Sequence, residues 1–440
     1  MTVTAAPPVS NVKTLLDIWN PEDEELWAAG GSKIARRNLA FSILTEHVGF
    51  SVWSLWSVLA LFLTPAYHVD AAGKFMLTAV PSLVGAVMRL PYSFAVTRFG
   101  GRNWTVFSAL ILLIPCGLAA TMIKPGVSYT TLVILAAITG VGGGNFASSM
   151  TNINAFYPQR LKGWALGLNA GGGNIGVAAV QLVGLGVLAW AGKGHPGIVA
   201  GVYLPLIIVS ACAAALWMNN LPNQKTEKGA LREVCRNGHT WAVSVLYIGT
   251  FGSFIGFGFA FGQVLQVQFK SEFATPIDAA YLTFLGPLLG SLVRPIGGRL
   301  ADVFGGARVS FLNFAAMAAG AAVVYEASRR HSLPAFITGF ILLFVFSGLG
   351  NGSVYKMIPA IFSRETPQRA RRLSGALIGV AGAIGAFGGV LVNLAFRESF
   401  LTYKTGDAAY LAFLAFYAVC AVLTWAVYLR GAKSRGASAV

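Results

Sequence analysis

The stretch GAVMRLPYSFAVTRFGG, residues 85–101, places an arginine inside a long apolar run and closes the run with Phe-Gly-Gly. The stretch GSLVRPIGGRLADVFGG, residues 290–306, repeats the first glycine, the arginine and the Phe-Gly-Gly, each 205 residues later (290 against 85, 294 against 89, 304 against 99). A charged residue inside an apolar run is rare, so its return at the same offset as its neighbours indicates an internal duplication. The chain is therefore predicted to consist of two related halves.

Long apolar runs surround both stretches and fill most of the chain. Of the 440 residues, 55% are hydrophobic and 11% are charged, against roughly 25% charged residues in an average soluble protein. A soluble fold cannot bury so much apolar surface, whereas a bilayer accepts helices of about 20 apolar residues. Together with the turn signals between them, the runs predict about twelve membrane helices. Their approximate bounds are 40–64, 74–97, 104–123, 130–156, 162–190, 199–219, 240–268, 277–298, 309–327, 335–361, 373–396 and 408–429.

The predicted architecture is an all-α membrane protein with two pseudo-symmetric six-helix bundles, which is the layout of a duplicated secondary transporter. The bundles are assigned to residues 39–219 and 240–430, and a polar cytoplasmic linker at 220–239 joins them. Residues 1–38 and 431–440 are predicted to be cytoplasmic segments. The first of them contains an acidic cluster and lacks the apolar core of a signal peptide.

The distribution of lysine and arginine sets the predicted orientation. With the N-terminus inside, the loops and tails carry 21 cations on the cytoplasmic side and 8 on the far side. This bias places both termini in the cytoplasm, in a protein integral to the cytoplasmic (inner) membrane. Because the cations lie between apolar runs and form no basic stripe, the net charge of +16 reflects membrane topology, and no nucleic-acid partner is predicted. The three remaining cations, Arg89, Arg294 and Lys356, fall inside apolar runs.

Arg89 and Arg294 are the first candidates for a ligand site. An arginine within a bilayer costs about 2.5–3.5 kcal/mol on insertion scales and cannot lose its proton. Only one acid, Glu46, lies well inside a run, so the two charges need a mobile anion. Symmetry places the arginines on opposite walls of a central cavity, where their forks favour a small planar oxyanion such as nitrate, nitrite or a small carboxylate. The alternative is a structural role, with each arginine bound to helix-end carbonyls.

Glycine-rich runs favour a very small substrate. The first half contains GGGNFASS at 142–149 and ALGLNAGGGNIG at 165–176, and related runs occur at 348–353 and 374–389. Within them, Gly144-Asn145 and Gly350-Asn351 form a further repeated pair, 206 residues apart. Small residues let membrane helices pack closely. A cavity between such helices suits a tiny anion better than a sugar.

These motifs together resemble the nitrate/nitrite porter family of the major facilitator superfamily. GGGNFASSM at 142–150 is similar to the family's nitrate signature, as are the glycine-rich runs around Asn174 and Gly379 and the two intramembrane arginines. The first helix, from Phe41 to Trp56, is also similar, and the resemblance covers nearly the whole chain after about residue 39. It implies the major facilitator fold, alternating-access transport of nitrate and nitrite in nitrate assimilation, and a functional monomer.

The resemblance also implies roles for single residues. In that family two arginines hold the anion, and the matching positions are Arg89 and Arg294. An asparagine of the fifth helix donates to the anion, which matches Asn174. Aromatic residues of the seventh and fourth helices line the site, and the matching residues are Tyr247, Phe251 and Phe146.

The loop after the second helix of each half is expected to act as a gate. Its first copy, with Arg98 and Arg102, has Thr97 where the superfamily usually has an acid, whereas the second copy keeps Asp302. The acid can hold an arginine of the gating loop in one conformation, and threonine cannot. The two gates are therefore predicted to differ in strength.

Glu46 and Lys356 are the candidates for proton coupling. Nitrate is too weak a base to carry a proton, so a symporter needs a titratable protein group. Both residues are predicted to lie roughly 10 Å inside the bilayer at 1.5 Å per residue, which permits a buried ion pair that titrates as a unit. This pair favours nitrate/proton symport. The alternative is a static ion pair in a nitrate/nitrite antiporter, whose empty arginines repel each other so that the carrier closes only when loaded.

Other classes of function find less support. The five histidines and four cysteines show no metal-ligand spacing and there is no P-loop, so no enzyme, metal or cofactor is predicted. A channel could use the arginines as a selectivity ring, but the duplication favours alternating access. The most serious rival is a major facilitator carrier of a small carboxylate such as formate. The predicted partners are nitrate, nitrite, protons and the lipid bilayer.

Overall fold

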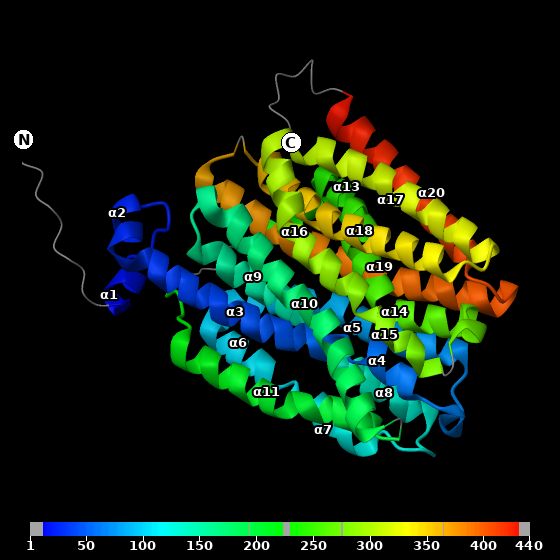
Figure 1. Ribbon diagram of the computed structural model, residues 1–440. Helices are drawn as coiled ribbons and strands as arrows, with labels where there is room; N and C mark the ends of the chain where they lie inside the picture. The colour runs from blue at the N-terminus through cyan, green and yellow to red at the C-terminus, as the bar shows by residue number, and fades with distance from the viewer. Residues whose placement is uncertain (1–11, 193, 223–228, 274–275, 364, 431–440) are drawn as a thin grey trace, which may run out of the picture.

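A computed structural model of the chain describes residues 12–192, 194–222, 229–273, 276–363 and 365–430, and these ranges contain helices and no strands. Figure 1 shows long helices that run side by side, with the first half of the chain (blue to green) below the second half (light green to red). The predicted tail 431–440, residues 1–11 of the predicted N-terminal segment and residues 223–228 of the predicted linker lie outside the described residues.

The first half contains six membrane crossings, preceded by two short helices, α1 (Val12–Asp17) and α2 (Glu24–Leu26). The crossings are α3–α4 (Ser32–Trp53 and Trp56–Phe62), α5 (Ala71–Phe99), α6–α7 (Gly101–Leu110 and Leu113–Met122), α8–α9 (Tyr129–Thr139 and Asn145–Phe156, joined by a 3₁₀ turn at Gly140–Gly144), α10 (Gln159–Ala191) and α11 (Pro196–Trp217).

The second half repeats this order after the linker helix α12 (Ala230–Cys235). Its crossings are α13–α14 (Gly238–Tyr247 and Ser253–Gln268, joined by a π-helical turn at Ile248–Gly252), α16 (Leu285–Phe304, after the short α15 at Ala280–Thr283), α17 (Gly306–Arg329), α18 (Leu333–Ile361), α19 (Pro367–Tyr403) and α20 (Asp407–Thr424).

Within the described ranges, ten helices are long and apolar enough to cross a membrane by length and composition. The interrupted α3–α4 and the charge-bearing α16 complete the twelve predicted crossings, so the predicted fold class is confirmed. The first crossing differs from its predicted start because α3 begins at Ser32. Its first turns contain Lys33, Arg36 and Arg37, and an apolar run therefore does not mark them.

The pseudo-symmetry extends to the backbone at the Phe-Gly-Gly repeat. Gly100 follows α5 with φ of 86°, and Gly305 follows α16 with φ of 87°. Residues with a side chain rarely adopt this positive φ, so glycine is needed at both positions to turn the chain into the next helix. The duplicated motif thus encodes the same turn in both halves.

The two halves meet along α5 against α19 and along α10 against α16. At the end far from the chain termini, Thr78 Oγ1 donates a 2.7 Å hydrogen bond to Asn393 Oδ1, and Phe75 stacks on Phe400 with ring centroids 5.7 Å apart. Both contacts join α5 to α19 and close the interface between the halves at that end.

Candidate functional site

Two buried arginines, one from each half, define the candidate site. Arg89 lies in the middle of α5 with 0% of its surface exposed, and Arg294 lies in the middle of α16 with 2% exposed. Arg89 Nη1 donates a 2.9 Å hydrogen bond to the carbonyl of Gly382, and Arg294 Nη2 donates a 3.1 Å hydrogen bond to the hydroxyl of Tyr247. Both acceptors are neutral, so neither hydrogen bond brings a counter-charge to the arginines.

Three nitrogen donors of these arginines are free. Arg89 Nε, Arg89 Nη2 and Arg294 Nη1 are buried and have no hydrogen-bond partner among the described residues. An unpaired buried donor costs about 1–3 kcal/mol, and more when the group is charged. A single small anion that accepts from both guanidinium groups would satisfy these donors. The structural alternative, in which backbone carbonyls bind the arginines, accounts for only one nitrogen of Arg89.

Two aromatic rings lie against both guanidinium groups. Phe146 of α9 and Phe251 of the π-helical turn stack with their ring centroids 5.6 Å apart. Arg89 Cζ is 4.4 Å from the Phe146 centroid and 4.6 Å from the Phe251 centroid, and the corresponding distances for Arg294 Cζ are 5.7 and 5.9 Å. Cations are attracted to aromatic faces, so the rings help to hold both guanidinium groups without neutralising them.

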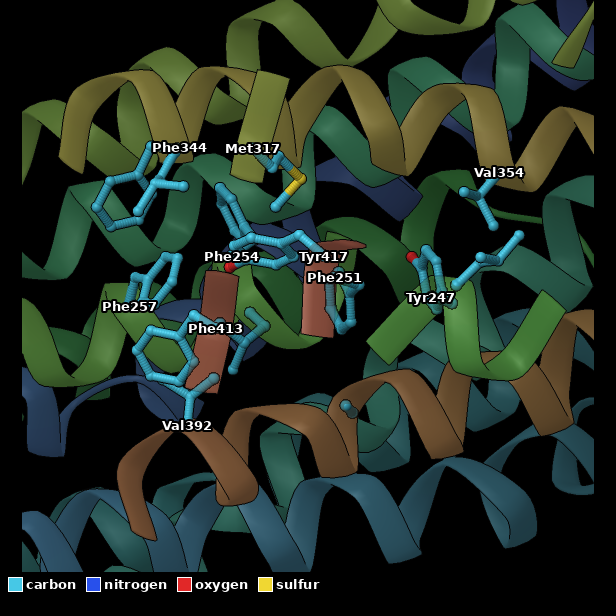
Figure 2. Close-up of a cluster of buried hydrophobic side chains, with 14 of the residues drawn as sticks. Tyr247, Phe251, Phe254, Phe257, Met317, Phe344, Val354, Val392, Phe413 and Tyr417 are labelled. Atoms are coloured by element: carbon cyan, nitrogen blue, oxygen red, sulfur yellow. The ribbon is translucent and has the colours of Figure 1, made fainter. Parts of the chain in front are cut away.

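The π-helical turn at Ile248–Gly252 positions two of the aromatic residues. Tyr247 precedes the turn, Phe251 lies in it, and their rings stack at 5.1 Å. Figure 2 shows them at one end of a row of aromatic side chains that continues through Phe254 and Phe257. Gly252 lets the turn lie against α19, because a Cβ there would come within 2.7 Å of the backbone of Gly388. Such turns are rare and often occur at functional sites.

Asn174 is fully buried on α10. Neither its amide nitrogen nor its amide oxygen has a hydrogen-bond partner in the part of the chain that the structure describes. Buried amides normally have partners, so this one is expected to meet a ligand or water. The adjacent Gly173 has no room for a Cβ because the carboxylate of Glu46 occupies that space. Helix α10 therefore carries a free amide beside a buried acid.

Glu46 of α3 is buried inside the first half. Ser149 Oγ and Asn169 Nδ2 both donate to Glu46 Oε2, the latter over 2.7 Å. Ser149 also shares a 2.9 Å hydrogen bond with Ser42. Glu46 Oε1 has no hydrogen-bond partner within the described ranges. Neutral donors from α9 and α10 thus hold one carboxylate oxygen, and the other is free.

The predicted buried pair of Glu46 with Lys356 is wrong for this structure. Lys356 instead forms an ion pair with Asp302, and the two side chains are 40% and 47% exposed. The prediction used depth along each helix, which does not fix the direction in which a side chain points. Lys356 lies on α18, which packs against Asp302-bearing α16 in the same half, whereas Glu46 faces α9 and α10 in the other half.

The same ion pair gives Asp302 a lysine of α18 as its partner in this structure. Its predicted contact with an arginine of the gating loop concerns one conformation of the carrier and stays a prediction. In the first half, Arg98 Cζ lies 5.6 Å from the ring of Phe99, and the backbone N–H of Arg102 donates to Asn220 Oδ1 over 2.9 Å. The two copies of the loop therefore make different contacts, an ion pair in one and an asparagine cap in the other.

A cavity of about 430 Å³ extends from the arginine site toward the end of the molecule that carries the chain termini. Its walls come from α9 and α10 of the first half and from α16, α18 and α19 of the second. Arg294 lines this cavity, whereas Arg89 lies outside its lining. Lys356 and Asp302 line it as well, beside residues at the helix ends. The site therefore has a cavity on one side and closed helix contacts on the other.

Tyr355 and Asn351 of α18 belong to this region. Asn351 lies in the repeated glycine-rich run at 348–353, but neither residue was predicted to contact the anion. The Tyr355 ring lies 4.6 Å from that of Tyr247, and Arg294 Cζ lies 5.6 Å from it. Asn351 lines the cavity and is itself fully buried. The sequence signal is their spacing of four residues, which puts both on one face of a helix, but that face can be assigned only once the packing of α18 is known.

Residues 42–392 match the family model of the Major Facilitator Superfamily. The chain is 37% identical to the nitrate/nitrite transporter NarU of Salmonella typhimurium, over 94% of this chain and 96% of that protein. It is 32% identical to the "Probable nitrate/nitrite antiporter NarK2" of Thermus thermophilus, over 95% of this chain and 97% of that protein.

Among solved structures, a partially occluded inward-open conformation of the xylose transporter XylE from E. coli is similar to this chain, with a TM-score of 0.69 at 14% identity. The similarity covers 90% of this chain and 97% of that chain, and at this identity it shows the fold alone. The NarU and NarK2 relatives are similar over nearly their whole length and are named as transporters and not as enzymes. The chain therefore belongs to the nitrate/nitrite porter family of the major facilitator superfamily.

Proposed function

We propose that this protein transports nitrate and nitrite across the cytoplasmic membrane by alternating access, with the anion held between Arg89 and Arg294. The observation that carries the proposal is the set of three free donors on two buried guanidinium groups from opposite halves. A planar oxyanion accepts from a guanidinium fork through two oxygens at once. The names of the NarU and NarK2 relatives support the same substrates.

The remaining predicted residues complete this proposed site. Asn174 donates its free amide N–H to the anion, and Tyr247 orients Arg294 through its hydroxyl. Phe146 and Phe251 lie against both guanidinium groups and limit the thickness of the ligand to that of a flat ion. A tetrahedral anion of the same charge is thicker and is expected to be excluded.

The proposed mode of transport is symport of nitrate with protons, with Glu46 as the proton carrier. Its support is a buried carboxylate with one free oxygen, beside Asn174-bearing α10. Lys356, which pairs with Asp302 in the cavity wall, has no part in this version of the mechanism. The alternative mode is nitrate/nitrite exchange, which the printed name of the Thermus relative favours. A carrier of a small carboxylate such as formate is the second alternative.

The proposed orientation has both termini, the linker 220–239 and the open end of the cavity in the cytoplasm, because cations accumulate on that side. Residues 39–219 and 240–430 form the two moving bundles in this proposal. The protein is proposed to work as a monomer, since each of its two halves contributes one arginine to a single site.

Purified protein in liposomes tests the substrate assignment. Uptake of labelled nitrate is measured with nitrite, chlorate, formate or sulfate added in excess outside. Nitrite is expected to compete strongly, because it is a small flat monoanion. Chlorate is a pyramidal monoanion and is expected to compete less, and sulfate is expected to leave uptake unchanged. Competition by formate as strong as that by nitrite would favour the carboxylate carrier. Protein-free liposomes provide the background.

Replacing Asn174 with alanine is expected to weaken nitrate binding by about 1.5–3 kcal/mol, because a charge-assisted hydrogen bond is lost. This corresponds to a rise of roughly 10- to 150-fold in Kd, measured by calorimetric titration of the purified protein. Asn313→Ala is the matched control, because Asn313 is also buried but contacts the sulfur of Met317 on α17. An unchanged Kd for Asn174→Ala would assign Asn174 to helix packing.

A further inference from the structure

Helix α18 presents two polar side chains to the cavity, next to the arginine site. Asn351 and Tyr355 are four residues apart and therefore lie on one face of the helix, one turn from each other. Both line the cavity, as does Arg294 of the adjacent α16. The proposed anion site between Arg89 and Arg294, called the clamp below, gives these two residues no role.

Asn351 is buried, and its side-chain amide lacks hydrogen-bond partners among the described residues. Its exposed fraction is 0%, and neither Nδ2 nor Oδ1 has a hydrogen-bond partner in the described part of the chain. Such a group costs about 1–3 kcal/mol unless something binds to it. Because the residue lines the cavity, the missing partner can reach it from that side. A donor amide at this position is suited to an anion that enters or leaves the clamp.

Tyr355 adds a hydroxyl and a ring at the inner end of the same cavity. Its hydroxyl donates a long, 3.5 Å hydrogen bond to the carbonyl of Ile378 and also interacts with the side chain of Tyr247. The long bond is weak, so an anion in the cavity can replace the carbonyl as the acceptor. Its ring packs edge-on against Phe146, with centroids 6.2 Å apart, and lies 5.6 Å from Arg294 Cζ. Tyr355 therefore stands between the aromatic residues of the clamp and the open cavity.

The two arginines differ in their access to this cavity. Arg294 lines it and keeps a free Nη1, whereas Arg89 is bound to Gly382 and lies outside the lining. An anion that moves from the clamp into the cavity therefore leaves Arg89 first and stays beside Arg294. The next donors along that wall are the Tyr355 hydroxyl and the Asn351 amide.

We propose that Asn351, Tyr355 and the free Nη1 of Arg294 form a second binding position for the transported planar oxyanion, on the cavity side of the clamp. The anion moves between the two positions without losing contact with Arg294. This inference rests on the proposed function and adds an intermediate binding position on the cavity side of the clamp only. The second position lowers the barrier to entry and release through the cavity, because an oxyanion that leaves the clamp gains new hydrogen-bond donors there as it loses those of Arg89.

The test uses the fact that the second binding position lies on only one side of the clamp. Nitrate half-saturation is measured from each face of the membrane, with right-side-out and inside-out vesicles that contain the full chain. Vesicle orientation is read from the accessibility of a C-terminal tag. Asn351→Leu with Tyr355→Phe is expected to raise the half-saturation from the cavity side by about 3- to 10-fold, the effect of one or two lost hydrogen bonds, and to leave the opposite side unchanged. Tyr355→Phe alone, which removes a single oxygen, is expected to show a smaller shift of the same sidedness.

Two outcomes would overturn the inference. Equal increases on both sides would assign the residues to the clamp itself, and no change on either side would leave them as packing residues. Tyr417→Phe is the matched control, because Tyr417 is buried and bonded to Ser253 on the other face of the second half. Failure of the proposed function has a different signature, since the unaltered protein would then move no nitrate in either type of vesicle.

Discussion

Replacing either Arg89 or Arg294 with lysine is expected to abolish nitrate transport while the protein still folds and inserts. Lysine keeps the positive charge but loses the planar fork that bonds two oxygens at once. For Arg89 three kinds of contact are lost. Its guanidinium donates to Gly382, lies against Phe146 and Phe251, and presents two free nitrogens to the anion. One ammonium group cannot occupy all these positions. We expect uptake to fall at least about 100-fold, as for loss of about 3 kcal/mol.

The measurement is labelled-nitrate uptake into liposomes, with equal amounts of monodisperse protein for each variant. Arg330→Lys is the matched control, because Arg330 forms an exposed ion pair with Glu326 far from the clamp. Near-normal uptake by a well-folded Arg89→Lys or Arg294→Lys protein would remove the central claim of the proposed function. Loss of uptake with retained tight nitrate binding would instead place the affected arginine in the conformational change.

The duplicated stretch made these two arginines predictable, because a charge at the same offset as its neighbouring glycines cannot be explained by apolar filler. The twelve crossings were predictable from the length of the apolar runs, because the thickness of the bilayer fixes how many apolar residues each helix needs. The placement of Phe146 and Phe251 in the site was predicted from the family resemblance alone. Nothing in their spacing alone distinguishes a ring against a guanidinium from a ring in the core.

The partners of Glu46 and Lys356 were not predictable in this way. Two opposite charges at similar depth suggest a pair, yet pairing depends on which helix faces which, and that is set by tertiary packing. The acid that Lys356 contacts, Asp302, was assigned to a gating loop because of its motif. In the structure Asp302 lies near the end of α16, which packs directly against the α18 helix of Lys356, and its side chain is 47% exposed. Ser149 and Asn169, which hold Glu46, are separated from it by more than 100 positions in the chain.

The second large effect is expected for Glu46→Gln, which replaces an acid with a neutral group of the same shape. The variant keeps an oxygen that accepts from Ser149 and Asn169, so the local packing is preserved. It cannot gain and lose a proton. If Glu46 is the proton carrier, nitrate accumulation driven by an inward acid gradient disappears, whereas exchange of nitrate for nitrate continues because Arg89 and Arg294 are unchanged.

Liposomes without internal nitrite or nitrate separate the two modes. A gradient of one pH unit stores about 1.4 kcal/mol per proton, so one-to-one symport concentrates nitrate up to about tenfold when the membrane potential is clamped. We expect this accumulation for the unaltered protein and none for Glu46→Gln. Lys356→Gln distinguishes the structural arrangement from a buried pair: with Lys356 bound to Asp302 in the cavity wall, accumulation persists, whereas a coupling pair would lose it.

Uptake by the unaltered protein only after preloading with nitrite or nitrate would make the carrier an exchanger. Glu46 would then be a structural acid, fixed by the hydrogen bonds that Ser149 and Asn169 donate to its buried carboxylate. The substrate assignment would stand in that case, because it depends on the free donors of Arg89 and Arg294 and not on Glu46. The coupling mode and the anion site are thus separable, since the proton carrier and the anion clamp consist of different residues on different helices.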